Sequence, residues 1–82
     1  MEENRIAVIA IIVENPESVR ELNEILHEYS SIIIGRMGIP YREKKVSLIS
    51  IAVDSDSNTI NAMTGRLGKL DGVTVKAAYS KK

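Results

Sequence analysis

The side chains that could take part in metal or acid-base chemistry are few and scattered. The chain has one histidine, His27, and no cysteine. A lone histidine supplies one of the three or four ligands that a zinc site needs, so we expect no metal and no cofactor. His27 falls in the last turn of a predicted helix, where an imidazolium favourably meets the negative end of the helix macrodipole.

Two carboxylates, Asp54 and Asp56, stand just before a second predicted helix. Aspartates in that place are more often N-caps than metal ligands or general acids. No nucleophile lies in a recognisable pattern with a base and a group that would orient it. We therefore expect the protein not to be an enzyme.

One short segment has residues suited to holding a ligand, and it reads Gly35-Arg36-Met37-Gly38. Glycine lets backbone N–H groups approach a bound molecule, and arginine offers a planar donor fork for a carboxylate or phosphate. A bulged edge strand would carry the same glycines without any ligand, and the residues leave both interpretations open. With Asn15, which follows the first predicted strand, these four residues form the candidate effector or partner site.

Two surface patterns lie on the predicted helices. Gly65 and Gly68 point away from the apolar stripe of the second helix, and each costs about 1 kcal/mol relative to alanine. They suggest close approach by another backbone or a ligand, although exposed glycines are also simply tolerated. The outer face of the first helix carries four carboxylates, for which a solvated face is the simpler explanation than a docking stripe for a basic partner: Glu17, Glu21, Glu24 and Glu28.

The first half of the chain predicts a strand, a helix and a hairpin. Residues 6–13 are eight consecutive apolar residues, typical of a central strand buried on both faces. Asn15-Pro16 then begins a helix over residues 16–28. Residues 32–40 and 46–53 form the hairpin, and two glycines and a proline place its first strand at the sheet edge.

The second half predicts a helix and a final strand. Apolar residues recur at helical spacing from Ile60 to Leu70, and Asp71-Gly72 ends this helix. Residues 73–80 then alternate as a half-buried strand. The order strand, helix, strand, strand, helix, strand predicts an α+β, ferredoxin-like βαββαβ fold. It has a four-stranded antiparallel sheet with two helices on one face, and the first and third strands lie at its centre.

Composition narrows the partners of this single domain, which we expect to span residues 1–82. Eleven basic and eleven acidic residues balance, so no overall field attracts nucleic acid. No apolar run approaches the roughly 20 residues of a membrane span, and the start Met1-Glu2-Glu3 is acidic where a signal peptide is basic. We expect a cytoplasmic protein without direct contact to nucleic acid or membrane.

Small size predicts self-association. A domain of this length gains from a disulfide, a metal or a partner subunit, and the first two are excluded by composition. If the helices cover one face of the central strands, the other face still shows isoleucine and valine. We expect a dimer or tetramer with Ile9 and Ile49 facing outward at the interface, and Gly65 and Gly68 as further candidate interface residues.

Three functions of ferredoxin-like domains are excluded. The two central strands carry no aromatic residue on which RNA bases could stack. Metal-transfer domains need paired cysteines after the first strand, and this chain has none. An acylphosphatase-like anion cradle would stand where Glu14 to Glu17 place carboxylates that repel phosphate.

Three segments resemble one family over essentially the whole chain. They run from Ile33 to Arg42, from Val46 to Ser50 and from Thr64 to Val73, and they resemble the proposed regulators of the iron-only hydrogenase system. That family is similar in fold to ACT domains and to the C-terminal domain of the nickel-responsive repressor. The resemblance implies an oligomeric regulator with an effector site.

The chain departs from both of these related folds. The nickel-repressor domain binds metal through several histidines and a cysteine, whereas this chain has His27 alone. ACT domains place glycine after the first strand, where this chain has Glu14-Asn15-Pro16. Both departures argue against nickel or an amino acid as the effector.

The predicted function is a homo-oligomeric regulatory domain of the iron-only hydrogenase system. It would bind a small effector or a protein of that system. The alternative is a structural or assembly protein that docks on a partner without any effector.

Overall fold

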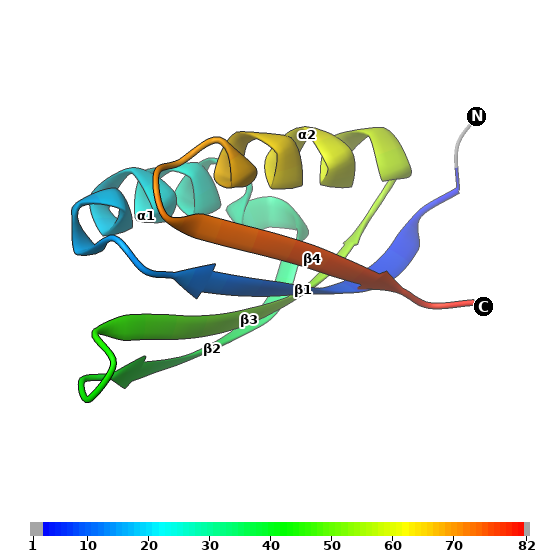
Figure 1. Cartoon of the computed structure of the whole chain (residues 1–82). Helices are drawn as coiled ribbons and strands as arrows, with labels where there is room; N and C mark the ends of the chain where they lie inside the picture. Colours follow the sequence, from blue (N-terminus) through cyan, green and yellow to red (C-terminus); the bar gives the residue numbers. More distant parts are fainter. Residues whose placement is uncertain (1–2, 82) are drawn as a thin grey trace.

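A four-stranded antiparallel sheet with two helices on one face makes up the protein (Figure 1). The computed structural model describes residues 3–81. The strands are β1 (Arg5–Val13), β2 (Ile33–Tyr41), β3 (Val46–Ser55) and β4 (Val73–Tyr79), and the helices are α1 (Val19–Glu28) and α2 (Ser57–Gly68). The sheet order is β2-β3-β1-β4, so β1 and β3 lie at the centre. The predicted ferredoxin-like fold is confirmed.

The first helical segment begins where the sequence predicted, but its first turn is narrower than an α-helix. A 3-10 turn, η1 (Pro16–Ser18), precedes α1. Pro16 suits this start because it has no N–H to satisfy. Asn15 caps the turn, since its Oδ1 accepts a hydrogen bond from the backbone N–H of Glu17 at 3.0 Å.

Strand β2 lies at the sheet edge, as its glycines and proline indicated. A second 3-10 turn, η2 (Ser30–Ile32), leads into it from α1. Its pairing with β3 shifts register between Ile33 and Gly35, so Ile34 is the extra residue of a β-bulge. The bulge, Gly38 and Pro40 all weaken this edge as a template for further strands.

Asp56 caps helix α2, which confirms the capping interpretation for one of the two aspartates. Its carboxylate accepts hydrogen bonds from the backbone N–H of Thr59 at 3.0 Å and from the Thr59 hydroxyl at 2.7 Å. Asp54 instead belongs to β3, where it pairs with Ile6 and is exposed. Neither α1 nor α2, nor any other helix within residues 3–81, is long and apolar enough to cross a membrane.

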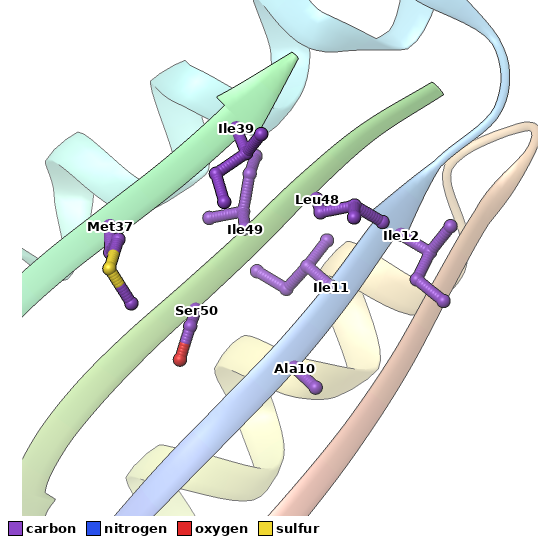
Figure 2. A pocket seen from close by; sticks show the side chains of 8 residues that line it. All are labelled: Ala10, Ile11, Ile12, Met37, Ile39, Leu48, Ile49 and Ser50. Atoms are coloured by element: carbon purple, nitrogen blue, oxygen red, sulfur yellow. The ribbon is translucent and has the colours of Figure 1, made fainter. Parts of the chain in front are cut away.

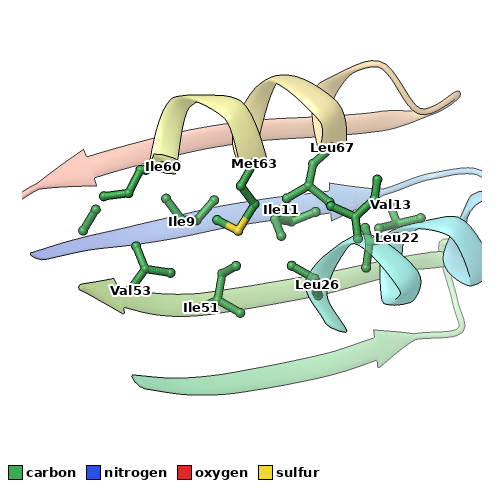
Figure 3. Close-up of a cluster of buried hydrophobic side chains, with 12 residues drawn as sticks. Ile9, Ile11, Val13, Leu22, Leu26, Ile51, Val53, Ile60, Met63 and Leu67 are labelled. Carbon is green, nitrogen blue, oxygen red and sulfur yellow. The ribbon is translucent and has the colours of Figure 1, made fainter. Parts of the chain in front are cut away.

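The core lies between the helices and one face of the sheet (Figure 3). Its members are buried apolar side chains of β1, β3, α1 and α2: Ala7, Ile9, Ile11, Val13, Leu22, Ile25, Leu26, Ile51, Val53, Ile60, Met63 and Leu67. Along β1 every second residue belongs to this set. Within the single chain β1 is therefore buried on one face, and burial on both faces would need a further covering layer.

The expectation that Ile9 and Ile49 face outward is wrong. Ile9 has no exposed surface and points into the core in Figure 3. Ile49 pairs with the buried Ile11, which puts it on the same face, and it packs half-buried at the margin of the core. The odd-numbered and the even-numbered residues of segment 6–13 are both apolar, so the sequence could not show which of the two sets the helices cover.

The N-cap of α2 predicts a pH-dependent stability. Hydrogen bonds from Thr59 hold the pKa of Asp56 below its ordinary value. The native state thus favours the ionised carboxylate, and this stabilisation is present above the ordinary aspartate pKa and lost as the pH falls through the lowered value. Urea denaturation should show Asp56→Ala less stable than the wild type at neutral pH, with the difference shrinking below about pH 3.

Asp54→Ala is the matched control, because Asp54 is exposed and makes no capping bond. A stability difference for Asp56→Ala that stayed constant from neutral to acid pH would contradict the role assigned to the charged cap.

Candidate functional site

The sheet face opposite the helices is open and apolar. Figure 2 looks onto this open face, with the helices behind the sheet. Strand register places seven large hydrophobic residues on it, and each keeps between 41% and 65% of its surface exposed: Ile6, Val8, Ile12, Met37, Ile39, Tyr41 and Leu48. Ala10, Ser50 and Ala52 fill the spaces between them.

The exposed area is large for a domain of this size. A large hydrophobic side chain offers roughly 200 Å², so seven that are about half exposed present on the order of 700 Å². That exceeds the roughly 300–600 Å² of the largest apolar patch on a typical monomer. It approaches the roughly 800 Å² that each partner buries in a standard protein interface.

The centre of the open face is free of charge. Among the residues that pair in the four strands, register puts two charged side chains on this face, Asp54 and Lys76. Asp54 lies near the end of β3, and Lys76 lies on the edge strand β4. A partner could therefore cover the centre without stripping water from a charge.

A shallow hollow of about 220 Å³ lies within the open face (Figure 2). Ser50 is its one polar lining residue, and the others are apolar: Ala10, Ile11, Ile12, Met37, Ile39, Leu48 and Ile49. Pockets that enclose small molecules usually measure about 300–1,000 Å³ and carry several polar groups. This hollow suits an apolar side chain from a partner better than a small effector.

The segment from Gly35 to Gly38 is divided between the two faces of β2. Gly35 and Met37 lie on the open face, opposite Ala52 and Ser50. Arg36 and Gly38 lie on the helix-covered face. A Cβ atom added to Gly35 would meet nothing within 4 Å, so the packing of this chain does not require a glycine there.

Arg36 reaches from the edge strand to helix α1. Its guanidinium donates a hydrogen bond to Oδ1 of Asn23 at 2.9 Å. No carboxylate within residues 3–81 forms an ion pair with it. Among residues 3–81 its guanidinium therefore has a neutral hydrogen-bond partner and no carboxylate in direct contact, and it has five N–H donors in all.

Asn15 lies apart from this segment. Its Nδ2 donates a hydrogen bond to Oδ2 of Asp71 at 2.7 Å, and the N–H of Glu14 donates one to the carbonyl oxygen of Gly72 at 2.7 Å. These bonds tie the end of β1 to the start of β4, whereas β2 lies beyond β3. The structure assigns Asn15 a bracing contact and does not bring it to Arg36.

Gly65 and Gly68 are exposed along α2, and a Cβ on either would meet nothing within 4 Å. They line a depression between α2 and the edge strand β4 together with Asn61, Thr64 and the residues from Val73 to Ala77. Their role in close approach by a partner stays a prediction.

The remaining candidates for chemistry are separated on the surface. His27 lies exposed in the last turn of α1, and no group of three metal-ligating side chains lies together within residues 3–81. Glu28 forms an ion pair with Arg66 at 2.8 Å, which joins the two helices. The hydrogen bond from Arg66 lowers the pKa of Glu28.

Comparison with known proteins places this chain in a family. Residues 5–77 match the TM1266-like family, whose description proposes a regulator of the iron-only hydrogenase system. The chain belongs to this family, and the resemblance found in the sequence is confirmed. Among curated proteins no sequence matches the chain.

Several solved structures are similar in fold to this chain. TM1266, an uncharacterized protein of Thermotoga maritima, is 36% identical, with a TM-score of 0.92 over 96% of this chain and 100% of that chain. The formyltetrahydrofolate deformylase of Pseudomonas putida KT2440 is 11% identical, with a TM-score of 0.63 over 89% of this chain and 28% of that chain. The de novo designed protein Foldit4 is 22% identical, with a TM-score of 0.61 over 98% of this chain and 99% of that chain. The last two show the fold alone.

Sequence reasoning anticipated an apolar open face but not most of its members. Met37 was among the candidate partner-binding residues, whereas the residues missed are the even-numbered ones of β1, Ile39 and Tyr41 of β2, and Leu48 of β3. The alternation of large and small residues from Met37 to Tyr41 was a usable signal, because a strand with large apolar residues at every second position must show them on one face.

The bracing contact at Asn15 predicts a strong effect at Gly72. Gly72 has φ of +69°, and an added Cβ would lie 2.8 Å from the Cβ of Asn15. Gly72→Ala should lower the free energy of unfolding by about 2 kcal/mol or more, because the left-handed conformation alone costs roughly 1–2 kcal/mol. Urea denaturation measures this change.

Gly65→Ala is the control, since it adds a methyl group in open space on a helix. It should raise the free energy of unfolding by about 0.5–1 kcal/mol. Equal effects of the two substitutions would show that neither the backbone conformation nor the contact with Asn15 constrains Gly72.

Proposed function

We propose that the chain is a cytoplasmic, non-enzymatic regulatory domain of the iron-only hydrogenase system, working as a homo-oligomer that binds an effector. The observation that carries this proposal is the open apolar face. Membership of the TM1266-like family supports the regulatory role. The use of Asp56 as the N-cap of α2 supports a role without catalysis, because its carboxylate is already engaged by Thr59.

The energetics favour a covered open face. Burying on the order of 700 Å² on each copy gives a gross gain of roughly 15–20 kcal/mol per copy at about 25 cal/mol per Å². Association costs an estimated 4–15 kcal/mol in lost freedom of motion. Only the surplus that remains after this cost and after the ordering of side chains appears as affinity, and the large gross gain supports self-association through the open face.

The effector in this proposal is an anion, either a carboxylate or a phosphate. Arg36 supports this choice because its guanidinium contacts no carboxylate within residues 3–81 and is held in place by Asn23. Bidentate binding by arginine is well suited to both groups.

Strand β2 would connect effector binding to self-association. Arg36 lies on its helix-covered face, and the next residue, Met37, lies on the open face. A ligand that displaces Arg36 would also shift Met37 at the interface and so change the affinity between the copies. By linkage, self-association would change the affinity for the ligand by that same factor.

Charge on the open face should prevent self-association. Val8→Lys puts an ammonium group in the apolar face, which must be desolvated when a second copy covers it. Light scattering should find the wild type as an oligomer at micromolar concentration and Val8→Lys as a monomer with an unchanged circular dichroism spectrum.

Ser31→Lys adds the same charge at an exposed residue of η2 and should leave the oligomer intact. A monomeric wild type, or a Val8→Lys variant that remains oligomeric, would contradict the proposed use of this face.

Removal of Arg36 should abolish anion binding. Inorganic phosphate and citrate should raise the melting temperature of the wild type, because a ligand that binds only the native state stabilises it. Arg36→Ala should lose this shift while its own stability falls by about 1 kcal/mol or less, the value of one exposed hydrogen bond.

Arg20→Ala is the control, because Arg20 is a surface arginine that already has a carboxylate partner, Glu24, at 3.7 Å. It should keep the full shift. If neither anion shifts the wild type, the effector is wrong and the assembly role without an effector takes its place.

A further inference from the structure

The open face has two halves of unequal bulk. Ala10 and Ser50, which pair across β1 and β3, form the dividing row. Toward the β2–β3 turn lies the bulky half, consisting of Ile12, Ile39, Tyr41 and Leu48. On the other side lies the small half, consisting of Val8, Gly35, Ala52 and Ala78, with Ile6 farther out at the end of β1. Figure 2 shows Ile12, Ile39 and Leu48 on one side of Ala10 and Ser50.

This asymmetry restricts how a second sheet can cover the face. Packed sheets lie about 10 Å apart, with their side chains filling the space between them. If the bulky half met a bulky half, the sheets would be forced apart there and voids would remain over the small half. Voids lose van der Waals contact, and interiors are close-packed. The two sheets can keep a uniform distance only if the bulky half of one copy lies over the small half of the other.

The open face itself offers both shapes that this arrangement requires. In a two-fold dimer the same patch serves both subunits, so the patch must complement itself. The bulky half supplies the projecting side chains, and the small half, where Ala52 and Ala78 flank Val8, receives them. The apolar area on each copy also approaches what one partner of a standard interface buries.

We infer that the occupant is a second copy of this chain, packed face to face about a two-fold axis that runs across the strands along the row of Ala10 and Ser50. Each β1 then crosses the β1 of the other copy in the opposite direction. Leu48 covers Ala52 of the second copy, and Ile12 covers Val8 of the second copy. This arrangement rests on the self-association proposed above.

The edges of the row tolerate this symmetry. Met37 meets Met37 of the second copy, and methionine is flexible enough to fill an irregular gap. Lys76 pairs with Ala10 and therefore also meets its counterpart, but it lies on the outer strand β4, where both long side chains can carry their ammonium groups apart into solvent.

The competing arrangement has its axis parallel to the strands. It would put Leu48 of one copy beside Leu48 of the other, with both bulky halves in contact. The two arrangements therefore differ in which residues of the two copies are neighbours.

The absence of cysteine from the chain makes a direct crosslinking test possible. Leu48→Cys and Ala52→Cys are prepared as separate single variants, and each is treated with a short bis-maleimide alone and after mixing. The inferred arrangement predicts a crosslinked dimer in the mixture and little crosslinking of either variant alone, because Leu48 and its counterpart lie in opposite halves.

Ala10→Cys is the positive control, since it lies beside its counterpart in any face-to-face dimer centred on the dividing row. Circular dichroism and light scattering should be used to check that each variant keeps its fold and its oligomeric state.

The other outcomes are distinguishable. Crosslinking of Leu48→Cys alone overturns the inferred arrangement and keeps the proposed self-association. A dimer in which Ala10→Cys does not crosslink overturns the inferred interface, because another surface then joins the copies. A wild type that is monomeric overturns both the arrangement and the proposed function.

Discussion

One geometric constraint underlies the rest of the structure, because a sheet has two faces and this chain has helices for only one of them. Strand β1 is apolar on both faces from Ile6 to Val13, yet α1 and α2 cover only the face that carries Ile9 and Ile11. The hydrophobic core forms between that covered face and the two helices. The uncovered face carries the other residues of the same strands, among them Val8 and Ile12, which are also β-branched and apolar. The proposed self-association follows from the need to bury that second face.

Polar and charged side chains that could take part in chemistry instead link one element of the fold to another. Asn15 joins the end of β1 to Asp71 before β4, and Arg66 joins α2 to α1 through Glu28 and the ring of Tyr29. The exposed Arg66–Glu28 ion pair contributes little to stability, typically up to about 1 kcal/mol. Asn15 and Arg66 are thus engaged in contacts that link neighbouring elements of this chain.

Edge strand β2 is the element through which two kinds of binding could influence each other. Its alternation sends Met37 toward the open face and Arg36 toward α1. Because it has a neighbouring strand on one side only, and carries a bulge at Ile34, it is less constrained than β1 or β3. Displacement of an edge strand disturbs fewer contacts than displacement of a central one. The coupling proposed between anion and oligomer uses one of the two edge strands of the sheet.

The sequence alone determined the order of the elements, the edge position of β2, the cap at Asp56 and the family. These follow from local signals: apolar periodicity, glycine and proline, and the side chain that precedes a helix. It could not show which alternate residues of β1 face the helices, because Ala7 and Ile9 are no more apolar than Val8. Nor could it pair Arg36 with Asn23 or separate Asn15 from Arg36. Those outcomes depend on how the helices lie across the sheet, which long-range packing decides after each element has formed.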